Sequence, residues 1–186
     1  MSAQDSKLFV ISGPSGAGKG TLVTRVRERR SNLGLTVSAT TRAPRKGEVD
    51  GVNYFFLTRE EFDRRVANGE FVEWAEVHGN CYGTLVSEVT SKLASGASLI
   101  LEIDVQGALQ VKERFPEAVL IFIKPPSLEV LRERLVGRGP ETIELRMANA
   151  ADELALADRY DDVVVNDDLD RATDELVRVL DMHERI

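Results

Sequence analysis

The chain has 186 residues, of which 42 % are hydrophobic and 30 % charged, and this composition predicts one globular domain with a small insertion. A net charge of −7 argues against broad nucleic-acid binding, so we expect positive charge to be local. One cysteine excludes an intrachain disulfide and indicates a reducing compartment. The short polar start and the absence of a long apolar segment predict a cytoplasmic protein without a membrane partner.

An apolar run at residues 7–12 enters a glycine-rich turn, which a lysine and helical spacing over residues 21–30 follow. This order is typical of a phosphate-binding loop, in which backbone N–H groups and a helix N-terminus hold the anion. The lysine reaches the outer phosphates of a nucleotide. The alternative is a strand-to-helix turn with no ligand. The residues predicted to bind the nucleotide here are Gly13, Pro14, Ser15, Gly16, Ala17, Gly18, Lys19, Gly20 and Thr21.

The position after Lys19 departs from the usual motif. The motif places Ser or Thr there to touch Mg²⁺, whereas this chain has Gly20 and then Thr21. We therefore expect a metal that is held partly through water or by the nucleotide alone.

Further along the chain, buried apolar runs alternate with helical patterns. Such runs between helices predict an α/β fold with a parallel sheet covered on both faces. The later strands are expected at residues 97–103, 118–123 and 162–165, and the later helices at 106–114, 127–136, 143–157 and 170–185.

Residues 36–95 break this rhythm and are expected to form a small mixed α/β insertion. Shorter strands are predicted at 36–39, 53–57 and 71–77, and a capping-box pattern predicts a helix from Thr58 to about Asn68. Arg42 and Arg45 lie close together on a predicted loop, and arginine forks suit a phosphate group. Ser38 can add a hydroxyl donor, as can Tyr54. The alternative is a solvated loop of mixed charge.

Several long segments in this order resemble the guanylate kinases, a family of P-loop kinases, from about residue 7 to 185. The segments are 37–48 (VSATTRAPRKGE), 51–56 (GVNYFF), 71–75 (FVEWA), 79–84 (GNCYGT), 101–107 (LEIDVQG), 137–139 (GRG) and 165–168 (VNDD).

The resemblance implies transfer of the γ-phosphate of ATP to GMP, and to dGMP, with Mg²⁺, giving ADP and GDP in purine nucleotide metabolism. It also implies a P-loop kinase core at 1–35, 96–134 and 148–186, a GMP-binding region at 36–95 and a short lid at 135–147. The GMP phosphate would be held by Ser38, Arg42, Arg45, Tyr54 and Tyr82.

For the guanine base, the resemblance assigns Glu73 as acceptor for N1–H and the 2-amino group and Thr84 as donor to O6. Guanine's Watson–Crick edge offers two adjacent donors and one acceptor, which a carboxylate and a hydroxyl complement. Adenine would leave the carboxylate unpaired.

Glu102 and Asp104 end a buried strand on the same side, where open α/β sheets bind ligands. They could hold metal-bound water or the acceptor nucleotide, and we assign both to the GMP site. The alternative is that they only cap the following turn, and the sequence does not divide the roles between them.

The family's lid arginines, which neutralise charge on the transferring group, correspond to Arg134, Arg138 and Arg146. The alternative is that they are ordinary solvated arginines. The stretch between Arg138 and Arg146 is about three residues shorter than the family pattern suggests, which places the register of Arg146 in question. Asn166 is expected to contact the adenine of ATP or to belong to the N-cap region of the last helix.

Two other functions compete with this interpretation. Another nucleoside monophosphate kinase would share the loop and the lid, but Glu73 and Thr84 argue against it. A catalytically inactive guanylate-kinase-like protein-binding module usually loses loop glycines or the lysine, and both are present here. The sequence does not give the oligomeric state, so a homo-oligomer stays open.

Overall fold

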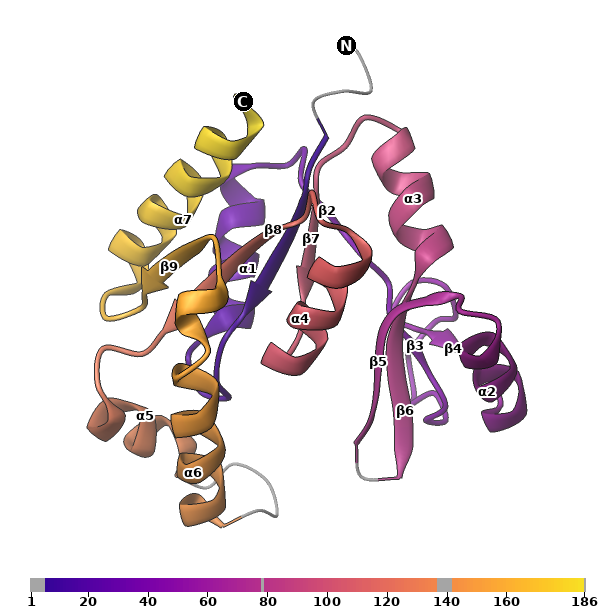
Figure 1. The fold of residues 1–186 in the computed structure, drawn as a ribbon, viewed down its shortest axis with the longest axis horizontal. Coiled ribbons are helices and arrows are strands. Elements are labelled where there is room, and N and C mark those ends of the chain that lie inside the picture. The colour runs from indigo at the N-terminus through magenta and orange to yellow at the C-terminus, as the bar shows by residue number, and fades with distance from the viewer. Residues whose placement is uncertain (1–5, 78, 137–141, 186) are drawn as a thin grey trace.

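A computed structural model of the chain describes residues 6–77, 79–136 and 142–185 and shows a parallel sheet with helices on both faces (Figure 1). Its five strands lie in the order β2-β7-β1-β8-β9, and every pair is parallel. The predicted α/β fold with a helix-flanked parallel sheet is confirmed, and β2 is an edge strand that the sequence did not predict. The strands are β1 (Leu8–Ser12), β2 (Gly34–Leu35), β7 (Leu99–Glu102), β8 (Val119–Lys124) and β9 (Asp162–Val165).

The central strand β1 is buried on both faces because helices cover each side of the sheet. Phe9 and Ile11 pack in one cluster with residues of α1 and α7, while Leu8 and Val10 pack in the other with residues of α4. Alternate side chains of a strand point to opposite faces, so one continuous apolar run supplies both clusters. The helices beside this sheet are α1 (Lys19–Arg29), α3 (Val86–Ala94), α4 (Val105–Arg114), α5 (Leu128–Leu135), α6 (Ile143–Leu154) and α7 (Leu169–Glu184), with a 3₁₀ turn at Ala157–Arg159.

A second sheet, in the order β4-β3-β6-β5, forms with helix α2 a unit that we call the insertion. β3 pairs in parallel with β4, and the remaining pairs are antiparallel. The presence of α2 beside these strands confirms the predicted mixture of helix and strand. Strand β6 and helix α3 were not predicted. The elements of the insertion are β3 (Ala39–Thr40), β4 (Phe55–Phe56), α2 (Arg59–Ala67), β5 (Phe71–Val77) and β6 (Asn80–Leu85).

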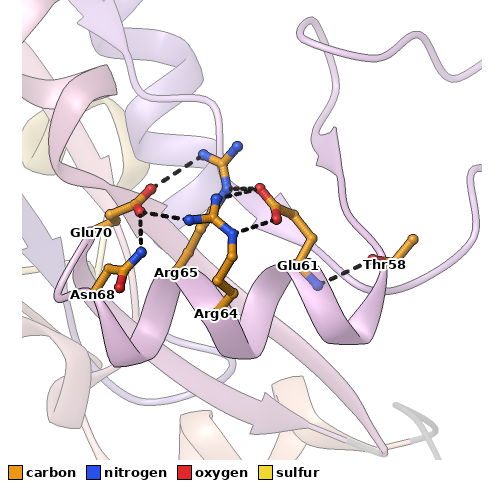
Figure 2. Close-up of polar contacts among 6 residues, drawn as sticks. All are labelled: Thr58, Glu61, Arg64, Arg65, Asn68 and Glu70. Atoms are coloured by element: carbon orange, nitrogen blue, oxygen red, sulfur yellow. Dashed lines mark hydrogen bonds and ion pairs between the residues drawn. The ribbon is translucent and has the colours of Figure 1, made fainter.

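Helix α2 begins where the capping box predicted it, with the Thr58 side chain accepting from Glu61 N over 3.1 Å. The Glu61 carboxylate accepts from both Arg64 and Arg65, and these contacts lower the pKa of Glu61 to about 2. Figure 2 shows that the same arginines also face Glu70, the residue before β5. Exposed pairs of this kind add little stability each, but together they fix the end of α2 beside the start of β5.

Helices α5 and α6 form a pair at the lower edge of Figure 1, below the main sheet. Helices α5 and α6 pack through Leu131, Leu135 and Ala150, on the side opposite the insertion. Helix α6 ends at Leu154, earlier than the predicted 157.

Of the predicted lid, residues 137–141 lie outside the described residues. Among the described residues, no helix is long and apolar enough to cross a membrane.

Candidate functional site

The loop between β1 and α1 has the backbone that a phosphate-binding turn requires. Gly13, Gly16 and Gly18 have φ values of 144°, 84° and 90°. A Cβ at Gly13 would lie 2.3 Å from Ile123 O, and one at Gly18 would lie 2.4 Å from the side-chain nitrogen of Asn166. Both the dihedral angles and the close contacts therefore demand glycine, so that backbone N–H groups can line an anion site.

Lys19 opens helix α1 and folds back over this loop. Its Nζ donates to Gly13 O over 2.5 Å and to Pro14 O over 3.1 Å. Burial lowers the pKa of Lys19, and the carboxylates of Glu102 and Glu153 oppose that shift. The ammonium group is therefore held at the mouth of the loop, within reach of an incoming phosphate.

A cavity of about 590 Å³ lies over the loop and is large enough to receive a nucleotide. Thr21, Glu102 and Arg134 lie in its wall together with Asn166 and the loop residues. The predicted loop residues Ser15, Gly16, Gly18, Lys19, Gly20 and Thr21 thus share one cavity with residues distant in sequence.

The Glu102 carboxylate lies beside the first turn of α1, next to Lys19. A Cβ built on Gly20 would lie 3.4 Å from Glu102 Oε1, an ordinary van der Waals contact, so this position brings the carboxylate close to the start of the helix. Burial raises the pKa of Glu102, and Lys19 lowers it in part. Carboxylate and hydroxyl oxygens at a phosphate site are ligands that suit Mg²⁺. Glu102 and Thr21 therefore fit a magnesium ion held mainly by phosphates and water.

Asn166, which directly follows β9, is buried with 6 % exposure and contacts the phosphate-binding loop. Its Nδ2 donates to Ala17 O over 2.8 Å, while Arg134 Nη2 donates to Asn166 O over 3.1 Å. The N-cap of α7 is Asp168, whose side chain accepts from Arg171 N, so Asn166 itself does not cap that helix. Contact of Asn166 with adenine stays a prediction.

On the insertion, Arg42 is held in a defined orientation. Its Nη1 donates to Glu48 Oε2 over 3.0 Å and to Ala43 O over 2.7 Å, and its Nη2 donates to Glu48 Oε1 over 2.8 Å. The guanidinium lies over the Tyr54 ring at 5.3 Å, and Tyr54 meets Tyr82 edge-on at 6.2 Å. The structure thus brings together three residues predicted to bind one phosphate.

Glu48 is a residue of this cluster that the sequence reasoning did not assign. Its carboxylate also accepts from Arg45 N over 2.6 Å, and these contacts lower the pKa of Glu48. The signal in the sequence was an acidic residue within a basic loop. Ser38 pairs through its carbonyl with Phe55 N, while phosphate contacts for the side chains of Ser38 and Arg45 stay predictions.

Glu73 and Thr84 face each other across β5 and β6, as the register Glu73↔Thr84 shows. Glu73 is 8 % exposed, and a Cβ on Gly107 would lie 3.2 Å from its Oε2. Burial raises the pKa of Glu73 to about 7, with Thr84 opposing the shift and the Asp104 charge adding to it. The carboxylate is thus desolvated with Thr84 as its hydrogen-bonding neighbour, and a ligand that brings further donors would stabilise the ionised form.

The structure separates the two strand-end carboxylates. Glu102 lies in the nucleotide cavity beside Lys19 and Gly20. Asp104 caps helix α4, since its Oδ1 accepts from Gly107 N over 2.7 Å, and its charge acts on both Glu73 and Lys19. This division favours a metal-water role for Glu102 over its assignment to GMP. A direct GMP contact for Asp104 stays a prediction.

The three predicted lid arginines lie in different parts of the chain relative to the nucleotide cavity. Arg134, near the end of α5, lies in the nucleotide cavity. Arg146 lies half-buried in the first turn of α6. Arg138 lies outside the described residues. The roles of Arg138 and Arg146 in charge neutralisation stay predictions.

Comparison with known proteins gives one consistent result. The sequence model of the guanylate kinase family matches residues 5–183. The chain is 56 % identical to the guanylate kinase of Gloeobacter violaceus over 94 % of this chain and 87 % of that protein. It is 51 % identical to the guanylate kinase of Halalkalibacterium halodurans over 97 % and 90 %. A crystal structure of guanylate kinase from Anaplasma phagocytophilum is similar with a TM-score of 0.73 and 37 % identity, over 96 % of this chain and 86 % of that one.

The packing of the loop predicts that Gly18→Ala weakens ATP binding by about tenfold or more, because the new methyl group displaces Asn166. The matched control is Gly96→Ala, whose φ of 82° imposes similar strain but whose Cβ meets no atom within 4 Å. Titration calorimetry with ATP measures both variants. Equal affinities for the two would contradict a role for the Gly18–Asn166 contact.

Proposed function

This chain belongs to the guanylate kinase family, and from that membership we propose that its site moves the γ-phosphate of ATP to GMP, giving ADP and GDP. One observation carries the assignment of residues. A phosphate-binding loop with its lysine and a buried carboxylate–hydroxyl pair both adjoin the region where β7 ends and α4 begins. Donor and acceptor nucleotides bound at these places would present their phosphates to each other.

The donor half uses the loop and its surroundings. Phosphoryl transfer depends on positioning and charge neutralisation more than on covalent chemistry of the protein. Lys19 would leave the carbonyls of Gly13 and Pro14 for the outer phosphates of ATP, and the loop N–H groups would hold the rest. Arg134 adds positive charge to the same cavity. When bound, Mg²⁺ would neutralise phosphate charge, with Thr21 and Glu102 as the residues nearest to it.

The acceptor half holds the GMP phosphate through Arg42. The guanidinium has five N–H donors in a fixed fork. Both N–H groups of Nη1 and one N–H group of Nη2 donate to Glu48 and to Ala43 O. These three bonds leave Nε–H and the second N–H of Nη2 for the phosphate. Tyr54 and Tyr82 would add hydroxyl donors beside it. Glu48 therefore orients Arg42 without using the whole fork.

The base is read by Glu73 and Thr84. The Glu73 carboxylate would accept from guanine N1–H and the 2-amino group, and the Thr84 hydroxyl would donate to O6. Adenine offers the opposite pattern at these atoms and would leave a buried carboxylate unpaired. We extend the proposal to dGMP as acceptor, to cytoplasmic purine nucleotide metabolism as the setting, and to a homo-oligomer as the assembly.

A coupled assay for ADP formation tests this function with GMP, dGMP, AMP and UMP as competing acceptors. We expect GMP to be preferred. Lys19→Ala should reduce the rate by about a hundredfold or more while the protein still folds, because the outer phosphates lose their lysine. Preference for AMP would contradict the proposal. Folded wild-type protein that binds GMP without turnover would indicate an inactive binding module instead.

Glu73→Gln should raise the KM for GMP about tenfold or more and leave the KM for ATP nearly unchanged, since Glu73 faces only the acceptor base. In the wild type, the KM for GMP should also rise as pH falls below about 7, because protonation removes the acceptor. Glu73→Gln should lack that component, whereas protonation of the GMP phosphate affects both proteins alike. Similar losses for both substrates, or identical pH profiles, would refute the placement.

A further inference from the structure

Arg114 connects helix α4 to the insertion and is not among the residues predicted to contact either nucleotide. It is the last residue of α4, and its Nη1 donates to Phe71 O over 2.8 Å while its Nη2 donates to Gly69 O. Both acceptors are backbone carbonyls, at the place where α2 has ended and β5 begins. A planar guanidinium on two carbonyls restricts the direction as well as the distance of a strand.

Strand β5 is the part of the insertion that rests on α4, beside which it runs in Figure 1. Val72 packs into the core cluster with Val105, Ala108 and Val111 of α4, whereas the preceding Phe71 packs inside the insertion. β5 is also an edge strand of its sheet. The two hydrophobic clusters therefore meet at consecutive residues of β5, as they also do at Leu85 and Val86, where β6 leads into α3.

The same helix meets the same strand again at its other end. Glu73 lies against Gly107 in the first turn of α4, where a Cβ would come within 3.2 Å of Glu73 Oε2. Gly107 and Arg114 are seven residues apart, which is about 10 Å along a helix. Two contacts between β5 and α4 thus lie at opposite ends of the helix. One holds the Glu73 carboxylate at Gly107, and the other is made by the Arg114 guanidinium.

A groove of about 420 Å³, open to solvent, lies beside this joint, and its wall includes Glu73, Trp74, Gln110, Glu113 and Arg114. Close packing is what normally fixes two elements against each other, and on this side of β5 solvent takes the place of packing side chains. The bonds from Arg114 lie beside the groove and restrain β5 there.

We propose that Arg114 is a positioning residue for guanine recognition: by holding Gly69 O and Phe71 O at the end of α4, it keeps Glu73 on Gly107. This inference rests on the proposed function, in which Glu73 reads the base. Release of β5 would move the carboxylate away from the base and admit water to it. Arg114 does not line the nucleotide cavity beside Lys19, so ATP binding should not depend on it.

The test compares Arg114→Gln with Arg114→Lys by steady-state kinetics. Loss of two charge-assisted bonds should raise the KM for GMP about five- to twentyfold in Arg114→Gln, with kcat and the KM for ATP within about twofold of wild type. Arg114→Lys should fall between, because an ammonium can still reach one carbonyl. Glu113→Gln, a neighbour on α4 that lines the same cavity, is the control and should behave as wild type.

A second readout separates positioning from a general structural effect. Hydration of Glu73 after release of β5 should move the acid limb of kcat/KM for GMP to lower pH in Arg114→Gln. An unchanged limb, a KM for GMP that stays at the wild-type value, or equal rises for GMP and ATP would each overturn the inference. If thermal unfolding shows that Arg114→Gln is not folded, Arg114→Lys decides by the same criteria. Failure of the proposed function would appear differently, as wild-type protein without GMP-dependent ADP formation.

Discussion

A buried carboxylate is the constraint on which the acceptor half of this molecule depends. Glu73 is almost fully buried, and that burial raises its pKa to about 7. An ionised group in such a place costs free energy until a ligand supplies donors. Guanine supplies two such donors, N1–H and the 2-amino group. The burial that disfavours an ionised Glu73 without ligand therefore also makes the difference in binding free energy between guanine and adenine large. Selectivity in this account is therefore a consequence of where β5 lies against α4.

The rest of the fold places a phosphate-binding cation in each half of the site. The carboxyl ends of β1 and β7 gather Lys19 and Glu102 for the donor nucleotide, as expected for an open parallel sheet. On the insertion, Glu48 aligns Arg42 and leaves part of its fork open. Each half thus holds its phosphate-binding cation against a protein acceptor until a nucleotide replaces or joins that acceptor.

The sequence predicted what local patterns determine and missed what depends on distant partners. The loop around Lys19 and the alternation of strands and helices follow from short-range spacing. Strand β6 (Asn80–Leu85) shows no clear apolar alternation because polar and small residues interrupt it, and its pairing with β3 and β5 is not visible in a local pattern. Asp104 could not be separated from Glu102 until the helix that it caps was visible. The role of Arg114 requires two carbonyls over forty residues away in sequence, which no local pattern reports.

The central claim, that buried Glu73 must be ionised to receive guanine, is tested most directly by counting protons. Titration calorimetry of GMP near neutral pH, in two buffers with different ionisation enthalpies, measures the protons released on binding. A carboxyl with a pKa of about 7 should release about half a proton more in the wild type than in Glu73→Gln. Equal release from the two proteins, together with equal GMP affinity, would contradict the claim.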